Sequence, residues 1–473
     1  MKMRRSIGNC RISSLRDAIF RHSEYVGNSI ISTKSVITAI AATILLLSVE
    51  SGNAANLYVR AGATGSNNGS DWTNAYTSIP TTLIRGNIYY IADGSYGKYT
   101  FNSPISGTSL ITIKKATILD HGTSTGWADN YGSSQAQFTG FVISAGYLTI
   151  DGVVGGGPSS WKSGHGFKIA TNYSQLLYFT KEVSNITLRH AELSFPTSEV
   201  DDTLSTDHIY SIFKITNFTI EYCYLHDSSR VFILSRGWDN VLVQYCWFAR
   251  NRSTPTRHSE GWSDNDGDNY VIRYNVWEDI EGTGVVVNLT GDCYNWEIYG
   301  NIVFWTGNQN YTGIGNGIFT TRTALANAYN WKIYNNTVYN SKGFNAFHTI
   351  YNGSNNIVKN NLWYICEGIG GFATTSVSTN EYNTFIMCGT SSVGGYNVTL
   401  TVGTDPFISS STQNFKLKAA MPGQNVSEVG KSFNIDFNGK IRSADGVWDR
   451  GALEFESSVK AIMPMYPGTI RIN

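Results

Sequence analysis

The chain carries little charge and no excess of either sign, which limits the partners it can bind. It has 35 Lys and Arg against 35 Asp and Glu, and charged residues make up 15% of the sequence. The first 55 residues hold seven of the basic and three of the acidic residues, so 28 bases and 32 acids follow them, a net charge of −4. Nucleic-acid binding relies on a basic excess that neutralises phosphates, so we expect no nucleic acid partner.

Long helical patterns are missing as well. No stretch of about 12 residues or more has apolar residues at helical spacing. The chain is instead rich in Gly, Asn, Thr, Ser and Tyr, with 47 Gly and 28 Tyr, and these residues favour turns and strands over helices. The composition therefore predicts an all-β fold.

What the sequence does contain is a nine-residue pattern that recurs seven times between residues 185 and 363. Asn stands first, an aliphatic residue fourth, Ala, Cys or Asn seventh, and an apolar residue ninth, as in NVLVQYCWF from Asn240. Successive copies begin 23 to 35 residues apart. Periods of roughly 20–50 residues indicate stacked supersecondary units, and the variable spacing indicates that loops of different length join constant strands.

Each copy also predicts where its side chains point. Apolar residues alternate with others over about four to six residues, which is typical of a strand. We expect the fourth position to face inward: Leu188, Ile220, Val243, Ile272, Ile298, Ile333 and Val358. The seventh position contains Ala191, Cys223, Cys246, Asn275, Asn301, Asn336 and Asn361. Buried amides need partners, so the pattern predicts an asparagine ladder at a turn, where Asn tolerates the left-handed conformation.

A second short strand follows each copy, often after Gly, as in GTGVVV and GIFTT. Two or three short strands per unit predict coils whose inner faces are buried by stacking. This repeat resembles the parallel β-helix repeat of the pectin-lyase-like superfamily over residues 56–455. The resemblance implies a right-handed parallel β-helix and is nearly silent about the reaction, because fold does not imply function.

Five cysteines follow residue 55, an odd number and fewer than a secreted disulfide framework uses. Cys223 and Cys246 share one repeat position and are expected about one coil spacing, ~4.8 Å, apart. A bridge between them is geometrically conceivable, but free buried thiols are the favoured interpretation. No Cys-x-x-Cys or His-rich spacing indicates zinc.

The N-terminal segment predicts export. An apolar run of 14 residues, Val36 to Val49, follows Lys34 and ends in the small residues of Ser51–Ala55. A spanning helix needs ~20 residues, so the run fits a secretory signal, with an uncleaved anchor or a buried strand as the alternative. We expect a secreted or cell-surface protein with no membrane-spanning segment after cleavage.

We divide the chain into four segments. Residues 1–55 are a signal peptide with a long leading region, and residues 56–104 are an N-terminal cap with the first strands. Residues 105–395 form the coils, and residues 396–473 form a closing segment and tail. The run Gly446–Glu454 resembles the closing segment that precedes anchors in surface β-helix proteins. We expect a monomer.

The richest polar stretch runs from Arg250 to Asp268, between the third and fourth copies. His258, Glu260 and Trp262 alternate, so on a strand they share one face and place an acid/base pair beside an aromatic ring. The candidate catalytic residues are Arg236, Arg257, His258 and Glu260, and the candidate substrate-binding residues are Trp238, Arg252 and Trp262. Arg matches a uronate carboxylate through two parallel hydrogen bonds. An exposed loop and coil is the alternative interpretation.

Three aspartates in this stretch are candidate Ca²⁺ ligands. Asp264, Asp266 and Asp268 supply oxygen donors at alternating positions, and Ca²⁺ is bound by oxygen. A tight turn is the alternative, because no Glu follows at the distance that a full EF-hand-type loop needs.

Together these features predict a secreted carbohydrate-active protein. The implied fold and the polar stretch favour a polysaccharide lyase-like enzyme, in which a Lys, Arg or His removes the proton next to the carboxylate of an acidic polysaccharide. One alternative is a non-catalytic adhesin or structural β-helix that binds glycan. Another is a glycoside hydrolase, which needs two facing carboxylates, such as Glu260 with Asp264 or Asp279. The motif series of polygalacturonase-type hydrolases and of pectate lyases are not visible in the sequence.

Overall fold

The computed structural model consists of strands and two short 3₁₀ turns, with no α-helix in its described part. It describes residues 54–158, 160–171, 175–196, 206–251, 259–282, 284–307, 317–321, 325–341, 352–367, 377–389, 397–400, 403–425, 434–442 and 446–456. Nearly all of the predicted signal peptide, residues 1–53, lies outside the described residues. None of the described residues forms a helix long and apolar enough to cross a membrane.

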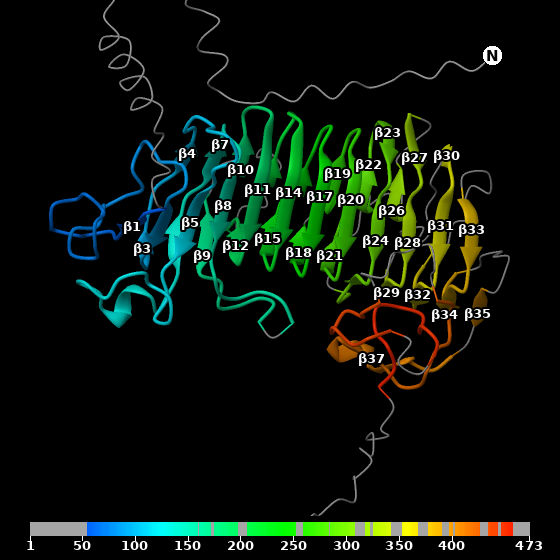
Figure 1. Cartoon of the computed structure of the whole chain (residues 1–473). Helices are drawn as coiled ribbons and strands as arrows, with labels where there is room; N and C mark the ends of the chain where they lie inside the picture. Colours follow the sequence, from blue (N-terminus) through cyan, green and yellow to red (C-terminus); the bar gives the residue numbers. More distant parts are fainter. Residues whose placement is uncertain are drawn as a thin grey trace, which may run out of the picture. The chain divides into compact units, whose positions relative to one another are not determined.

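Three long parallel sheets wind the chain into coils (Figure 1). Sheet A contains, in order, β1 (Asn56–Val59), β2 (Ile88–Ile91), β5 (Ile111–Lys115), β8 (Leu148–Asp151), β11 (Val183–Arg189), β14 (Ile215–Glu221), β17 (Asp239–Gln244), β20 (Asp268–Arg273), β24 (Glu297–Tyr299), β28 (Lys332–Tyr334), β31 (Asn356–Lys359) and β33 (Val377–Glu381). Sheet B contains β3 (Gly94–Ser95), β6 (Ala136–Phe138), β9 (Phe167–Ala170), β12 (Ala191–Ser194), β15 (Tyr224–Ser228), β18 (Trp247–Asn251), β21 (Val276–Ile280), β25 (Ile302–Phe304), β29 (Thr337–Tyr339), β32 (Leu362–Tyr364), β34 (Thr384–Ile386) and β35 (Val398–Leu400). Sheet C contains β4 (Tyr99–Phe101), β7 (Phe141–Ile143), β10 (Gln175–Phe179), β13 (Asp207–Tyr210), β16 (Val231–Leu234), β19 (Trp262–Asp264), β22 (Gly284–Asn288) and β26 (Gly317–Thr321).

Two smaller sheets and two 3₁₀ turns lie beside these coils in the described part of the chain. Sheet D is parallel and contains β23 (Gly291–Tyr294), β27 (Ala326–Tyr329) and β30 (Asn352–Ser354). The only antiparallel sheet among the described residues pairs β36 (Phe407–Ser409) with β37 (Asn414–Leu417), and the 3₁₀ turns are η1 (Asp129–Tyr131) and η2 (Ser410–Thr412). Each full coil contributes one strand to sheet A, one to sheet B and one to sheet C, and each strand pairs with its counterpart in the next coil. This arrangement is the predicted right-handed parallel β-helix.

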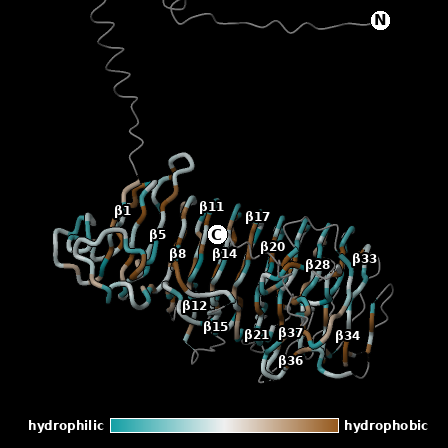
Figure 2. Tube along the Cα trace, turned by 60° about the horizontal axis from the view of Figure 1, so that its bottom comes forward, coloured by the Kyte–Doolittle hydropathy of each residue, from teal (hydrophilic) through white to brown (hydrophobic). Residues whose placement is uncertain are grey.

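Apolar residues fill the coils in the columns that the sequence predicts. Leu188, Ile220 and Val243 are in register on neighbouring strands of sheet A, and all three are fully buried. Figure 2 shows hydrophilic and hydrophobic residues interspersed along the strands, as expected when successive side chains point in and out. Burying one such aliphatic side chain contributes roughly 1.5–3 kcal/mol, so each coil is stabilised by its neighbours.

The predicted asparagine ladder is present in the later coils. Nδ2 of Asn275 donates to Oδ1 of Asn301 (3.1 Å), and the same bond, at 3.0 Å, joins Asn301 to Asn336, Asn336 to Asn361 and Asn361 to Asn383. Each of these oxygens also accepts the backbone N–H of the preceding ladder residue, as in Asn275 to Asn301 at 3.0 Å. Every amide in the column is thereby satisfied without water.

The left-handed residues lie beside this ladder and not in it, which corrects the expected turn geometry. The sixth repeat position turns the chain from sheet A to sheet B, with φ of 55° at Tyr222 and 52° at Tyr245. The first-position Asn is also left-handed, with φ of 58° at Asn217 and 56° at Asn240. These asparagines form a second, exposed ladder, since Nδ2 of Asn240 donates to Oδ1 of Asn217 (2.6 Å) and Asn217 donates to Asn185 (3.1 Å).

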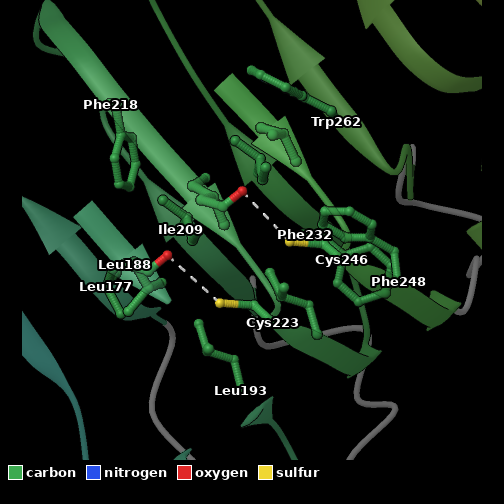
Figure 3. Close-up of a cluster of buried hydrophobic side chains, with 14 of the residues drawn as sticks. Leu177, Leu188, Leu193, Ile209, Phe218, Cys223, Phe232, Cys246, Phe248 and Trp262 are labelled. Carbon is green, nitrogen blue, oxygen red and sulfur yellow. Dashed lines mark hydrogen bonds between the residues drawn. The ribbon is translucent and has the colours of Figure 1, made fainter. Parts of the chain in front are cut away.

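Cys223 and Cys246 continue the inner ladder column as buried thiols (Figure 3). The Cys223 thiol donates to the carbonyl of Leu188 (3.8 Å), and the Cys246 thiol donates to the carbonyl of Ile220 (3.6 Å). All five described cysteines are free, which agrees with the favoured interpretation.

The closing segment packs against the outside of the later coils. Phe437, Trp448 and Leu453 join Tyr274 and Tyr299 in one apolar cluster. The backbone N–H of Ala452 donates to Oγ1 of Thr337 on β29 (2.9 Å). This segment therefore covers part of the outer face of sheet B.

Candidate functional site

Both tryptophans predicted to bind sugar lie inside the coils. The side chains of Trp238 and Trp262 are fully buried, and Trp262 belongs to the buried cluster drawn in Figure 3. Trp262 is in register with the interior residues Ile233 and Val286, and its ring stacks on Tyr270 with 4.9 Å between centroids. The prediction of a sugar platform was wrong for both. The alternation along β19 points Trp262 inward, and Trp238 packs against Phe218 in the core with 5.5 Å between ring centroids.

Glu260 is enclosed as well. Only 1% of Glu260 is exposed, and its Oε2 accepts a hydrogen bond from Oγ of Ser263 (2.9 Å). Glu260 therefore lacks the access that a catalytic acid or base needs, which corrects its predicted role. Arg236 is exposed on the turn after β16. The other three predicted residues lie outside the described residues: Arg252, Arg257 and His258.

The three aspartates predicted to hold Ca²⁺ do not converge. Asp264 is fully buried, and its Oδ1 accepts hydrogen bonds from the hydroxyls of Ser235 and Tyr270, the latter at 2.8 Å. Burial raises the pKa of Asp264 to about 7 although these hydrogen bonds act in the opposite direction. Asp266 is exposed and Asp268 is half-buried. No three His, Cys, Asp or Glu side chains in the described part of the chain are placed to hold a metal, so this set does not fit a Ca²⁺ site.

A different set of polar residues does converge, on the outer face of sheet B. We call it the sheet B cluster, and it consists of Lys168, Glu192, Tyr224, His226, Asp227 and Arg250. These residues come from four successive strands, β9, β12, β15 and β18. Lys168 is in register with Glu192, and Glu192 with Tyr224. A spacing of ~4.8 Å between neighbouring strands places side chains of one column in contact.

Asp227 and Arg250 meet because they occupy the same position in neighbouring coils. Both are left-handed, with φ of 59° and 60°, which is uncommon for residues other than Gly. Nε of Arg250 donates to Oδ1 of Asp227 (2.7 Å), and Nη2 donates to Oδ2 (3.0 Å). Burial opposes ionisation of Asp227, but hydrogen bonds from His226 and Arg250 outweigh it and hold its pKa well below the usual range.

His226 stands at the centre of the sheet B cluster. Its Nδ1 lies 2.6 Å from Oδ2 of Asp227 and 3.1 Å from Nη2 of Arg250. A carboxylate only accepts hydrogen bonds, so the shorter contact favours a proton on Nδ1. The ring stacks on Tyr224 with 4.1 Å between centroids, and Nη2 of Arg250 donates to the Tyr224 hydroxyl (3.1 Å). Nε2 of His226 lies 3.5 Å from Oε1 of Glu192 and makes no hydrogen bond to any described residue. An imidazole, a phenol and a guanidinium are thus held side by side.

Glu192 lies on the other side of His226. Its Oε1 accepts a hydrogen bond from Nζ of Lys168 (2.6 Å), and its Oε2 accepts one from Nε2 of Gln135 (3.0 Å). Burial acts to raise the pKa of Glu192, but its contacts with His226, Lys168 and Gln135 outweigh burial and lower the pKa to about 2. Glu192 is therefore ionised at neutral pH.

The loop between β8 and β9 brings another cation to this face (Figure 1). Nζ of Lys162 donates to Oε2 of Glu278 (2.6 Å) and lies 4.2 Å above the ring of Trp247. Nε1 of Trp247 donates to the same carboxylate oxygen (2.8 Å). The loop passes this close to the coils because Gly156 has no side chain: a Cβ there would lie 2.0 Å from the carbonyl oxygen of Tyr222.

In these three ion pairs the cation reaches solvent and the acid is buried beneath it. The side chains of Lys162, Lys168 and Arg250 are 36%, 31% and 33% exposed. Their respective acidic partners are 9%, 15% and 7% exposed. The outer face of sheet B therefore presents three cationic donors beside the rings of Tyr224 and Trp247.

A search for polar residues close together in sequence finds only part of this site. Arg250 opens the polar stretch and Glu278 follows it, but Glu192, Tyr224 and His226 lie one or two copies earlier. The available signal is positional: Glu192 and Tyr224 hold the eighth position of successive copies, and His226 follows two residues later. Stacking brings equal positions together, so polar residues need to be compared by column.

No family model and no curated protein matches this chain. Among solved structures, the pectate lyase Pel9A is similar with 14% identity and a TM-score of 0.46, over 85% of this chain and 98% of that one. The PL6 family polysaccharide lyase Pedsa3628 from Pseudopedobacter saltans has 14% identity and a TM-score of 0.35, over 75% and 96%. The GH136 lacto-N-biosidase from Eubacterium ramulus has 13% identity and a TM-score of 0.35, over 73% and 68%. These similarities concern the fold, which the sheet order and ladders of this chain define as a right-handed parallel β-helix.

Proposed function

We propose that this protein binds an acidic polysaccharide on the outer face of sheet B and cleaves it by β-elimination. The observation that carries the proposal is the exposure of Lys162, Lys168 and Arg250 above buried acidic partners. A uronate carboxylate matches a guanidinium through two parallel hydrogen bonds. The half-buried ring of Trp247, beside Lys162, offers apolar surface to a sugar ring.

The acid and the base of the reaction come from the centre of the sheet B cluster. In β-elimination a base removes the proton next to the uronate carboxylate, the electron pair forms a carbon–carbon double bond, and the bond to the leaving sugar oxygen breaks. We assign the base to His226, whose Nδ1 is held by Asp227 so that Nε2 accepts the proton. Tyr224, whose pKa is raised by burial, protonates the leaving oxygen. Arg250 stabilises the charge that develops on the carboxylate.

This assignment requires rearrangement on binding at both groups. Tyr224 is 6% exposed, so the leaving oxygen reaches its hydroxyl only after the neighbouring side chains move. In the free protein Nε2 of His226 is enclosed beside Glu192. A substrate carboxylate that replaces Glu192 as the partner of Lys168 frees the Glu192 side chain to move and opens Nε2. On the sequence alone, Arg257 and His258 remain proposed catalytic residues.

Non-catalytic glycan binding is the second candidate, and the enclosure of Nε2 favours it. The three exposed cations suffice to hold an anionic chain without any reaction. A hydrolase fits less well, because its general acid must be a protonated carboxyl group. Glu192 has a pKa of about 2, and the pKa of Asp227 is also held low.

The test is the ultraviolet absorbance of the unsaturated product. We would incubate the protein with polygalacturonate, alginate and chondroitin sulfate, each with Ca²⁺ and with chelator. Rising absorbance that is lost in Arg250→Ala is the expected result, and Arg257→Ala and His258→Ala show whether these residues take part. Binding without reaction establishes the second candidate, and release of reducing sugar without a rise in absorbance establishes a hydrolase. If the protein shows no binding and no cleavage, the proposal is overturned.

A further inference from the structure

A cavity lies further along the outer face of sheet B, where the closing segment overhangs it. Its volume is about 160 Å³, and it is lined by Phe304, Trp305, Thr306, Tyr339, Ser410, Ser411 and Gln413. A single water needs only ~10–15 Å³ of such space, so the cavity has room for a sugar ring.

The lining of this cavity is neutral, and Tyr339 supplies its accessible ring, since Phe304 and Trp305 are each only 1% exposed. Phe304 and Tyr339 are in register on β25 and β29, and Phe415 packs against them with ring centroids 5.4 and 5.8 Å away. The closing segment contributes hydroxyl and amide groups, including those of Ser411 and Gln413. No charged side chain of the described residues lines the cavity. A few polar groups among aromatic rings are typical of a site for a small neutral ligand.

The cavity is aligned with the sheet B cluster. His226, Ala249, Glu278, Phe304 and Tyr339 occupy one column of sheet B, each in register with the next. Three strand spacings of ~4.8 Å separate His226 from Phe304, about 14 Å in all. Between the two places the column is covered, because Ala249 is fully buried and Lys162 of the β8–β9 loop bonds to Glu278. The cavity is therefore a separate site on the same face.

We propose that the cavity binds a neutral sugar residue at a site separate from the sheet B cluster. This binding is measured by itself and does not rest on the proposed function.

The test fills the cavity. Ser411 is exposed on the closing segment and lines the cavity, so Ser411→Trp occupies the space without adding a side chain to the coil interior. Thr412→Trp is the matched control, because Thr412 is exposed on the same turn but does not line the cavity. Calorimetry with the full-length protein measures binding of uncharged tetrasaccharides of galactose, glucose and mannose. We expect one of them to bind wild type, Thr412→Trp and Arg250→Ala equally, and Ser411→Trp to lose roughly tenfold or more in affinity, which is about 1.4 kcal/mol.

Polygalacturonate, titrated in parallel, separates the two sites. Ser411→Trp is expected to bind it like wild type, while Arg250→Ala loses this binding. If Ser411→Trp fails to fold, Gln413→Gly replaces it, because Gln413 has a φ of 62° that Gly adopts freely, and the change removes the whole Gln413 side chain with its amide from the lining. Unchanged neutral-sugar binding in the cavity variant, or no neutral-sugar binding by wild type, overturns the cavity proposal. If wild type does not bind polygalacturonate, only the proposed function is overturned.

Discussion

Two outer faces of this β-helix carry charged side chains, and they are built differently. On sheet A one outward row is in register across successive coils: Lys114, Asp151, Arg189, Glu221, Gln244, Arg273 and Tyr299. Its members bond to the next residue in the row, as in Arg189 to Asp151 at 2.7 Å and Arg273 to Gln244 at 2.8 Å. These contacts join nearest neighbours along a single line, and Lys114, at the end of the row, pairs with Asp120 outside it.

On sheet B the contacts converge on one ring. His226 contacts Tyr224, Asp227 and Glu192, and Arg250 reaches both Tyr224 and Asp227. Parallel stacking alone makes a row such as that of sheet A, because equal positions of successive coils always meet. A row of charges is therefore weak support for a functional site, and convergence of unlike groups around one titratable ring is stronger support.

The largest difference is expected in activity. His226→Gln removes the proposed base, and general acid–base catalysis typically contributes about 10²–10⁴-fold to the rate, so we expect kcat on the cleaved polysaccharide to fall by that factor. Arg189→Ala, on sheet A, is the matched control and should leave kcat unchanged. Initial rates of product absorbance give both values. An unchanged kcat in His226→Gln would move the base to another residue.

The next difference concerns acid stability. The folded protein lowers the pKa of Glu192 from its usual 4.5 to about 2. Below about pH 4.5 the unfolded state binds the proton first, so the stabilisation is present above that pH and is lost as pH falls to about 2. This shift corresponds to roughly 3 kcal/mol. Urea titrations between these pH values should show a shallower loss of stability in Glu192→Gln than in wild type, and parallel curves would contradict the assignment.

The fold was largely predictable from the sequence because stacking turns each repeat position into a column. An aliphatic fourth position indicated an inward column, and Leu188 and Ile220 occupy it. An Asn at the seventh position indicated a buried amide that needs a partner in the next coil, and Asn301 and Asn336 bond in that way. These inferences need only the periodicity, which seven copies establish.

The site was less predictable because the residues of a short strand do not show which of its two faces points into the coil. The alternation of Glu260 and Trp262 fits either face of β19, and the register with Ile233 settles that Trp262 points inward. Asp227 and Arg250 meet because both adopt the left-handed conformation within sheet B strands, and the repeat pattern does not mark these positions. Charge density along the chain therefore located the neighbourhood of Arg250 but not its partners.

The smallest difference compares one ion pair from each face. Asp227→Asn leaves Arg250 without its bidentate partner, and breaking a buried pair costs ~3–5 kcal/mol; because Arg250 is 33% exposed, we expect about 2 kcal/mol. The Arg189–Asp151 pair is about equally exposed, but it has one hydrogen bond, and Glu221 lies 3.7 Å from Arg189 as a second partner. We therefore expect Asp151→Asn to cost less, in the ~0.2–1 kcal/mol range of exposed pairs. Urea unfolding of both variants at neutral pH measures the two losses. Equal losses would mean that the sheet B pair is no stronger than a pair of the sheet A row, and the contrast between the faces would then rest on His226 alone.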